Sequence, residues 1–100
     1  MSDVTLLEKV KLSARISGNA FDEDVQDMID SAREELVQSG VSRKVAESSD
    51  DPLIVRAMKI YVKANFGIDS PNAYRFHQSF ESLRRHLSMA GDYTDGNELE

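Results

Sequence analysis

Hydrophobic residues recur at intervals of three or four along four separate stretches of this chain, which is the spacing of one face of an α-helix. The pattern predicts helices over about residues 6–17, 52–66 and 71–90, and another that begins between 19 and 22 and ends at 39–40. No stretch alternates apolar and polar residues as a half-buried strand would. The sequence therefore predicts an all-α fold, a small domain of four helices.

Capping signals mark the ends of these helices. Thr5 and Glu8 have the spacing of a capping box, in which each side chain bonds the backbone amide of the other residue. Each of the last two helices starts with a proline after a capping residue and stops at a glycine: Asp51-Pro52 to Gly67, and Ser70-Pro71 to Gly91. Only three residues separate Gly67 from Pro71, so we expect these two helices to fold back as an antiparallel pair.

The apolar stripes also predict which side chains form the core. The helix over 52–66 is apolar over a wide arc, so we expect it to be the central and most buried element. The other helices each offer a narrower stripe: Leu6, Leu7, Val10 and Ala14; then Phe21, Val25, Met28, Ile29, Ala32 and Leu36; and finally Ala73, Phe76, Phe80, Leu83 and Leu87.

Two segments lack this periodicity. Residues 41–50 are polar, so we expect a mobile loop after the second helix, although Arg43 to Glu47 could form a brief turn. Residues 92–100 contain few apolar anchors and are expected to form a flexible C-terminal tail. The predicted organisation is therefore one helical domain over 1–91 and a tail over 92–100.

Composition narrows the classes of protein. The chain has 100 residues, of which 40% are hydrophobic, enough for one domain with a modest core. The absence of cysteine excludes disulfides and thiolate metal sites. No aliphatic run is long enough to predict a membrane span, and the first residues lack the pattern of a secretory signal. A net charge of −6 opposes non-specific binding to nucleic acid.

No pattern of catalytic or metal-binding residues emerges. His77 and His86 are nine residues apart on one predicted helix, so they face opposite sides and cannot share an ion. His77 and Glu81 have helical i,i+4 spacing, which a solvated pair explains better than half a metal site. There is no nucleophile elbow and no glycine-rich phosphate loop. We therefore expect no catalytic residue, no metal, no cofactor and no enzymatic activity.

Charged residues form two edges at helical spacing. The acidic edge lies on the second helix and the basic edge on the third: Glu23, Asp27, Asp30 and Glu34; and Arg56, Lys59 and Lys63. One interpretation is that both edges simply face water. Another is that they complement each other between neighbouring copies, in a head-to-tail contact that can close into a ring. A third, DNA binding by the basic edge, is disfavoured because three cations are few and no helix-turn-helix signature is clear.

Several stretches resemble the head-tail connector family of tailed bacteriophages. The first helix ends in Arg15-Ile16, an acidic turn over 21–25 follows, and the next helix contains the step Ala32-Arg33. Downstream, residues 51–57 and 60–67 resemble the central helix of that family, and 74–76 and 79–84 resemble its last helix. The resemblance covers about residues 4–87 and concerns patterns of helix and core rather than reacting groups.

The resemblance implies a head-completion adaptor. Such a protein docks on the portal vertex after DNA packaging, forms a dodecameric ring that extends the DNA channel, and recruits the next neck or tail protein. Its place would be the virion neck, and the host cytoplasm during assembly. Flexible segments that order on the portal suit this role. We therefore expect portal or partner contacts from the loop and the tail: Ser42, Arg43 and Lys44, and Asp92 and Tyr93.

Two other classes remain open from the residues alone. One is a small helical DNA-binding or regulatory protein, which would bind duplex DNA with a steep dependence on salt. The other is a helical partner-binding domain of a bacterial stress or antitoxin system, which would co-purify with a toxin enzyme. The adaptor interpretation instead predicts co-purification with a portal protein.

Overall fold

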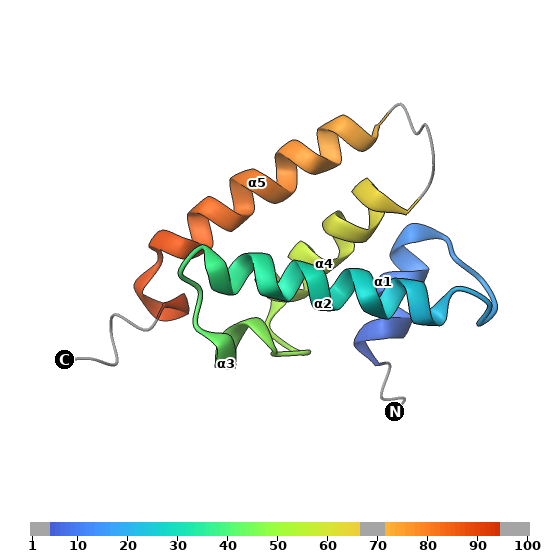
Figure 1. Cartoon of the computed structure of the whole chain (residues 1–100), viewed down its shortest axis with the longest axis horizontal. Helices are drawn as coiled ribbons and strands as arrows, with labels where there is room; N and C mark the ends of the chain where they lie inside the picture. The colour runs from blue at the N-terminus through green and yellow to red at the C-terminus, as the bar shows by residue number, and fades with distance from the viewer. Residues whose placement is uncertain (1–4, 67–71, 95–100) are drawn as a thin grey trace.

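The computed structural model describes residues 5–66 and 72–94 and confirms the all-α prediction. Within these residues, four long helices, one short helix and one 3-10 turn follow each other (Figure 1): α1 Leu6–Ala14, α2 Asp22–Gln38, α3 Arg43–Ala46, α4 Pro52–Asn65, α5 Ala73–Met89 and η1 Gly91–Tyr93. Within the described part, extended pairing is limited to a single antiparallel bridge between Val41 and Thr94.

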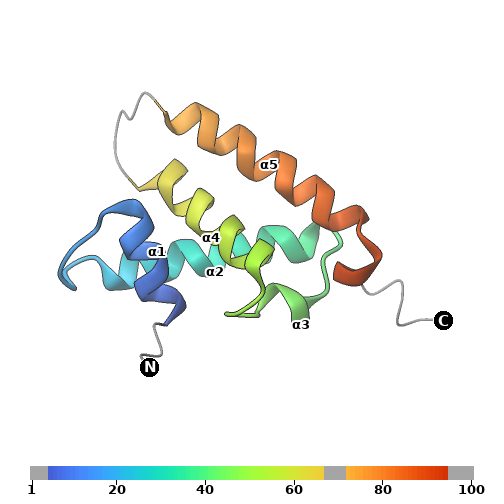
Figure 2. The ribbon, with the colours of Figure 1, turned by 180° about the vertical axis from the view of Figure 1, so that it is seen from behind.

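The helices pack around α4, as its wide apolar arc predicts. Helix α4 contacts α1, α2 and α5. In Figure 1, α2 crosses the face nearest the viewer with α1 and α4 behind it, and the view from behind in Figure 2 shows the reverse order. Helices α4 and α5 run side by side in opposite directions, so the predicted antiparallel pair is confirmed.

The core follows the predicted stripes with few exceptions. Side chains from α1, α2, α4 and α5 form one cluster, and α4 contributes more buried residues than any other described helix. Helix α4 buries two valines, Val55 and Val62, along with the rest of its apolar arc. Phe21 was predicted to lie in the core, but it lies at the N-cap of α2 and is 47% exposed. Its ring packs edge-on against Phe66, with centroids 5.3 Å apart, at the rim of the core.

Two of the predicted caps are present. Thr5 and Glu8 form the full capping box, with bonds of 3.1 and 3.2 Å to each other's amides. The Asp51 carboxylate accepts from the amides of Leu53 and Ile54 at 2.9 and 3.2 Å. These bonds satisfy amides that have no partner within the helix.

Other predicted helix ends need correction. Helix α1 ends at Ala14, before the predicted residue 17, because Arg15 adopts a left-handed conformation with φ 61°. Gly91 does not close α5: the helix ends at Met89, Ala90 is extended, and Gly91 starts η1. The predicted stop at Gly67 and start at Ser70-Pro71 lie outside the described residues.

The expected loop and the beginning of the expected tail are packed segments. Residues 43–46 form α3, and Val41 and Ala46 are buried, so the segment after α2 is ordered by contacts with the rest of the fold. Asp92 and Tyr93 belong to η1, and Thr94 pairs with Val41. The part of the predicted tail beyond residue 94 lies outside the described residues.

Candidate functional site

One carboxylate joins the C-terminal segment to the start of the central helix. The Tyr93 hydroxyl lies 3.0 and 3.1 Å from the two carboxylate oxygens of Asp51 and donates to that group, which also caps α4. The Ser42 backbone N–H donates to the Tyr93 carbonyl at 2.8 Å. Three segments that are distant in sequence therefore meet here: the connection after α2, the start of α4 and the end of α5.

We expect the hydrogen bond between the Tyr93 hydroxyl and the Asp51 carboxylate to be lost in alkali. Burial, followed by the bond to Asp51, raises the pKa of the Tyr93 hydroxyl above its ordinary value. A raised pKa contributes stability that is complete below the ordinary tyrosine value of about 10 and is lost as the pH rises beyond it. Tyr93→Phe should therefore reduce the loss of stability between pH 7 and about pH 10.5, as measured by urea unfolding. The control is Tyr74→Phe, at a tyrosine that is 69% exposed, and an equal effect there would contradict the expectation.

Arginine side chains fix α3 against α2. Arg33 donates to the carbonyls of Ala46 and Glu47 at 3.1 and 3.2 Å. Arg43 pairs with Glu34 at 2.8 Å, and the bond and charge of this guanidinium lower the pKa of the Glu34 carboxyl. The result is a short helix whose C-terminal carbonyls are satisfied by a side chain from another element.

The acidic edge is exposed along its whole length, but its two ends differ. At the C-terminal end, Glu34 pairs with Arg43, and Asp30 accepts from Gln26 at 3.1 Å and lies 4.0 Å from Arg33. At the N-terminal end, Glu23 and Asp27 have no ion pair among residues 5–66 and 72–94. The uncompensated negative charge is therefore concentrated on the first half of α2.

The basic edge lies on α4 and extends onto α1. Arg56 is exposed, Lys59 and Lys63 are half-buried, and the Lys63 ammonium lies 5.6 Å from the centroid of the Phe76 ring, a cation–π contact. Arg56 and Lys59 line a hollow together with Lys9 of α1; Asp50, Pro52 and Val55 complete it. We call this hollow the basic hollow. None of its three cations has a carboxylate within 4.0 Å in the described part of the chain.

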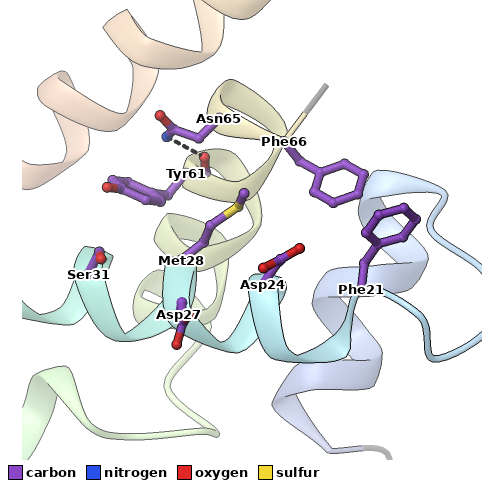
Figure 3. Close-up of a pocket in the computed structure, with 8 residues that line it drawn as sticks. All are labelled: Phe21, Asp24, Asp27, Met28, Ser31, Tyr61, Asn65 and Phe66. Atoms are coloured by element: carbon purple, nitrogen blue, oxygen red, sulfur yellow. Dashed lines mark hydrogen bonds between the residues drawn. The ribbon is translucent and has the colours of Figure 1, made fainter. Parts of the chain in front are cut away.

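An open apolar groove lies between α2 and α4 (Figure 3). It has a volume of about 660 Å³ and is lined by four apolar or aromatic residues and four polar ones: Phe21, Met28, Tyr61 and Phe66; and Asp24, Asp27, Ser31 and Asn65. Tyr61 is held in place by a 3.1 Å bond to Glu35 and by edge-on packing against Phe80. Burial, followed by the charge of Glu35, raises the pKa of its hydroxyl. We call this feature the α2–α4 groove.

Within the described residues, no cluster of three or more histidine, aspartate or glutamate side chains could hold a metal ion. None of the described helices is long and apolar enough to cross a membrane. The surface features described above are two charged edges, a groove and the hydrogen-bonded segments around Tyr93.

A family model described as phage connector protein matches residues 6–94, which is almost all of the described fold. The chain belongs to the phage connector protein family. Comparisons with curated proteins and with solved structures give no significant match. Membership identifies this connector as a structural component of the phage neck, where it acts with other head and tail proteins. The family is one of assembly proteins rather than enzymes.

The connector brings four of the five expected contact residues to accessible positions. Arg43, Lys44 and Asp92 are exposed and Tyr93 is half-buried, and the Ser42–Tyr93 backbone bond places α3 beside η1. Ser42, the fifth residue, is buried instead. Its side chain is only 3% exposed, because this residue lies between the Val41 bridge and the start of α3.

Sequence reasoning about the connector missed the α2–α4 groove. Phe21 was assigned to the core, and no role was given to Phe66 at the end of α4. Their positions in the sequence could have indicated the groove. Phe21 comes just before α2 and Phe66 just after α4, so both lie at the ends of the packed stripes. Side chains at such ends line a surface groove rather than fill an interior.

Proposed function

We propose that this connector docks on the portal vertex after DNA packaging, joins further copies in a ring that extends the DNA channel, and recruits the next neck or tail protein. The observation that carries the proposal is the family match over residues 6–94. Assembly takes place in the host cytoplasm, and the finished ring belongs to the virion neck.

The portal contact is proposed to come from the surface that α3 and η1 form together. Arg43, Lys44, Asp92 and Tyr93 belong to two segments that a backbone hydrogen bond holds side by side. One partner could therefore engage both segments at once. Because Tyr93 also bonds Asp51, a partner that binds here meets a surface braced against the central helix.

The ring is proposed to form by contact of the acidic edge of one copy with the basic edge of the next. Both edges carry exposed charges, and several of these lack an ion pair within the described residues. Complementary charges of this kind set partner choice and register more than affinity. The free connector is then expected to be monomeric, with the ring forming on the portal as a template.

Mixing purified portal with purified connector tests the role. Electron microscopy should show a ring of added density at the end of the portal channel, and the connector should sediment with the portal. The double variant Lys44→Glu/Asp92→Lys should bind portal at least about tenfold more weakly, because both altered charges lie on the proposed contact surface. The control variant Arg75→Glu changes an exposed charge on α5 and should bind normally. Portal that never acquires added density would contradict the proposal.

A further inference from the structure

The α2–α4 groove is not filled by the described part of the chain. Phe21 at its end is 47% exposed, and Met28, Tyr61 and Phe66 are half-buried although they are large and apolar or aromatic. Asp24 and Asp27 stand on its α2 side and are exposed (Figure 3). An apolar floor beside a negative rim suits an apolar side chain that is flanked by cations.

The connector carries such a side chain on another element. Leu12 of α1 is 74% exposed and lies three residues after Lys9, so the two share a side of that helix. Lys9 lines the basic hollow together with Arg56 and Lys59. Leu12 is therefore an exposed apolar residue beside a group of cations that have no ion pair within residues 5–66 and 72–94.

The groove and the basic hollow lie on different sides of α4. At about 100° per residue, Tyr61 in the groove is rotated by about 200° from Lys59 and by about 140° from Arg56 in the hollow. In Figures 1 and 2, α1 and α4 lie on the same side of α2, so the hollow that α1 and α4 share is separate from the groove between α2 and α4. Leu12 is 74% exposed and does not line the groove of its own copy, so a second copy can supply the leucine. A contact between two different surfaces repeats from copy to copy and closes into a ring when its rotation allows.

We propose that Leu12 of one copy inserts into the α2–α4 groove of the next copy, with Lys9 and Lys59 facing Asp24 and Asp27. This inference rests on the ring of the proposed function and gives that ring an apolar contact at its centre. A single inserted leucine makes a small interface, far below the area that holds a stable dimer together. The contact therefore acts between copies that a template has already gathered.

Cysteine pairing provides a direct test, because the natural chain has no cysteine. One variant carries Leu12→Cys and another Met28→Cys, and the two are mixed under mild oxidation, both alone at high concentration and after addition of portal. A mixed disulfide dimer should form with portal present. Met89→Cys, at a residue that is 82% exposed, replaces Leu12→Cys in the control mixture and should give no cross-link with Met28→Cys.

Charge exchange separates a specific contact from chance proximity. Adding Asp24→Lys/Asp27→Lys to the Met28→Cys copy should lower the cross-linking yield about tenfold, because cations would then face cations. Adding Lys9→Glu/Lys59→Glu to the Leu12→Cys copy should restore the yield. Circular dichroism of each variant confirms that the helices remain folded.

The outcomes distinguish this inference from the proposed function. If the connector forms a ring on portal but Leu12 and Met28 never cross-link, or if Met89 replaces Leu12 as the partner of Met28, the insertion is wrong and the portal role stands. If cross-links form between free copies while portal recruits no connector, the insertion stands and the portal role is wrong. Failure of charge exchange to restore the yield overturns the assignment of Lys9 and Lys59.

Discussion

Replacing Leu36 with alanine is expected to lower the free energy of unfolding of this connector by about 2–5 kcal/mol. Leu36 lies on α2, its side chain is fully buried, and it belongs to the core cluster that α4 organises. Removing its methyl groups takes away transfer free energy and leaves a cavity that neighbouring helices fill only in part. A domain of this size has a total stability of about 5–15 kcal/mol, so the loss is a large part of it.

The chain offers a matched control for this substitution in Leu12, which is 74% exposed. Leu12→Ala should change the free energy of unfolding by less than about 0.5 kcal/mol, as is usual for surface sites. Urea unfolding followed by circular dichroism measures both variants, with an unchanged m-value expected for each. Equal losses for the two leucines would show that α2 does not bury the stripe described above.

Asp51→Ala should have the second largest effect, a loss of about 2–3 kcal/mol. The carboxylate accepts from two amides at the start of α4 and from the Tyr93 hydroxyl, so the substitution removes a helix cap and an interaction between distant segments together. Asp51→Asn retains an acceptor for the cap and should be milder. Asp50→Ala changes the exposed neighbouring aspartate and supplies the control.

A double-mutant cycle separates the two contributions of Asp51. If the carboxylate bonds both α4 and Tyr93, the losses caused by Asp51→Ala and Tyr93→Phe should add to more than the loss of the double variant, because each single change already removes the shared bond. The difference should be about 1 kcal/mol, as is typical for one hydrogen bond. Strict additivity would mean that the C-terminal segment contributes nothing through Asp51.

Local signals in the sequence were enough to predict the positions of the four long helices. The capping box at Thr5 and the cap at Asp51 act within one turn of chain, and the stripes of α2 and α5 depend only on helical spacing. The end of α1 was missed because the Arg15 backbone closes the helix in a left-handed conformation. Residues other than glycine and asparagine rarely adopt this conformation.

Contacts between distant segments could not be predicted in this way. Helix α3 has only four residues, too few to be stable alone, and depends on Arg33 and Glu34 of α2. The segment around Tyr93 depends on Asp51 and Ser42, which lie more than forty residues earlier in the sequence. Hydrophobic spacing within one helix carries no information about such partners.

For the candidate surfaces too, the sequence predicted features within one helix but not those that join two helices. Spacing identified the acidic and basic edges, and their residues lie outside the core. Spacing could not show that Arg43 neutralises Glu34, or that Lys9 joins Arg56 and Lys59 in one hollow, because each of these pairings crosses from one helix to another. The α2–α4 groove could not be predicted either, because it depends on how the start of α2 and the end of α4 lie relative to each other.

The double use of Asp51 has a mechanical consequence. The same carboxylate holds the Tyr93 hydroxyl and the first amides of α4. A force that pulls Thr94 outward strains the backbone contacts with residues 41 and 42 together with that carboxylate, and through the carboxylate it reaches the helix around which the fold is built. One side chain thereby couples tension on the C-terminal segment directly to the start of the central helix.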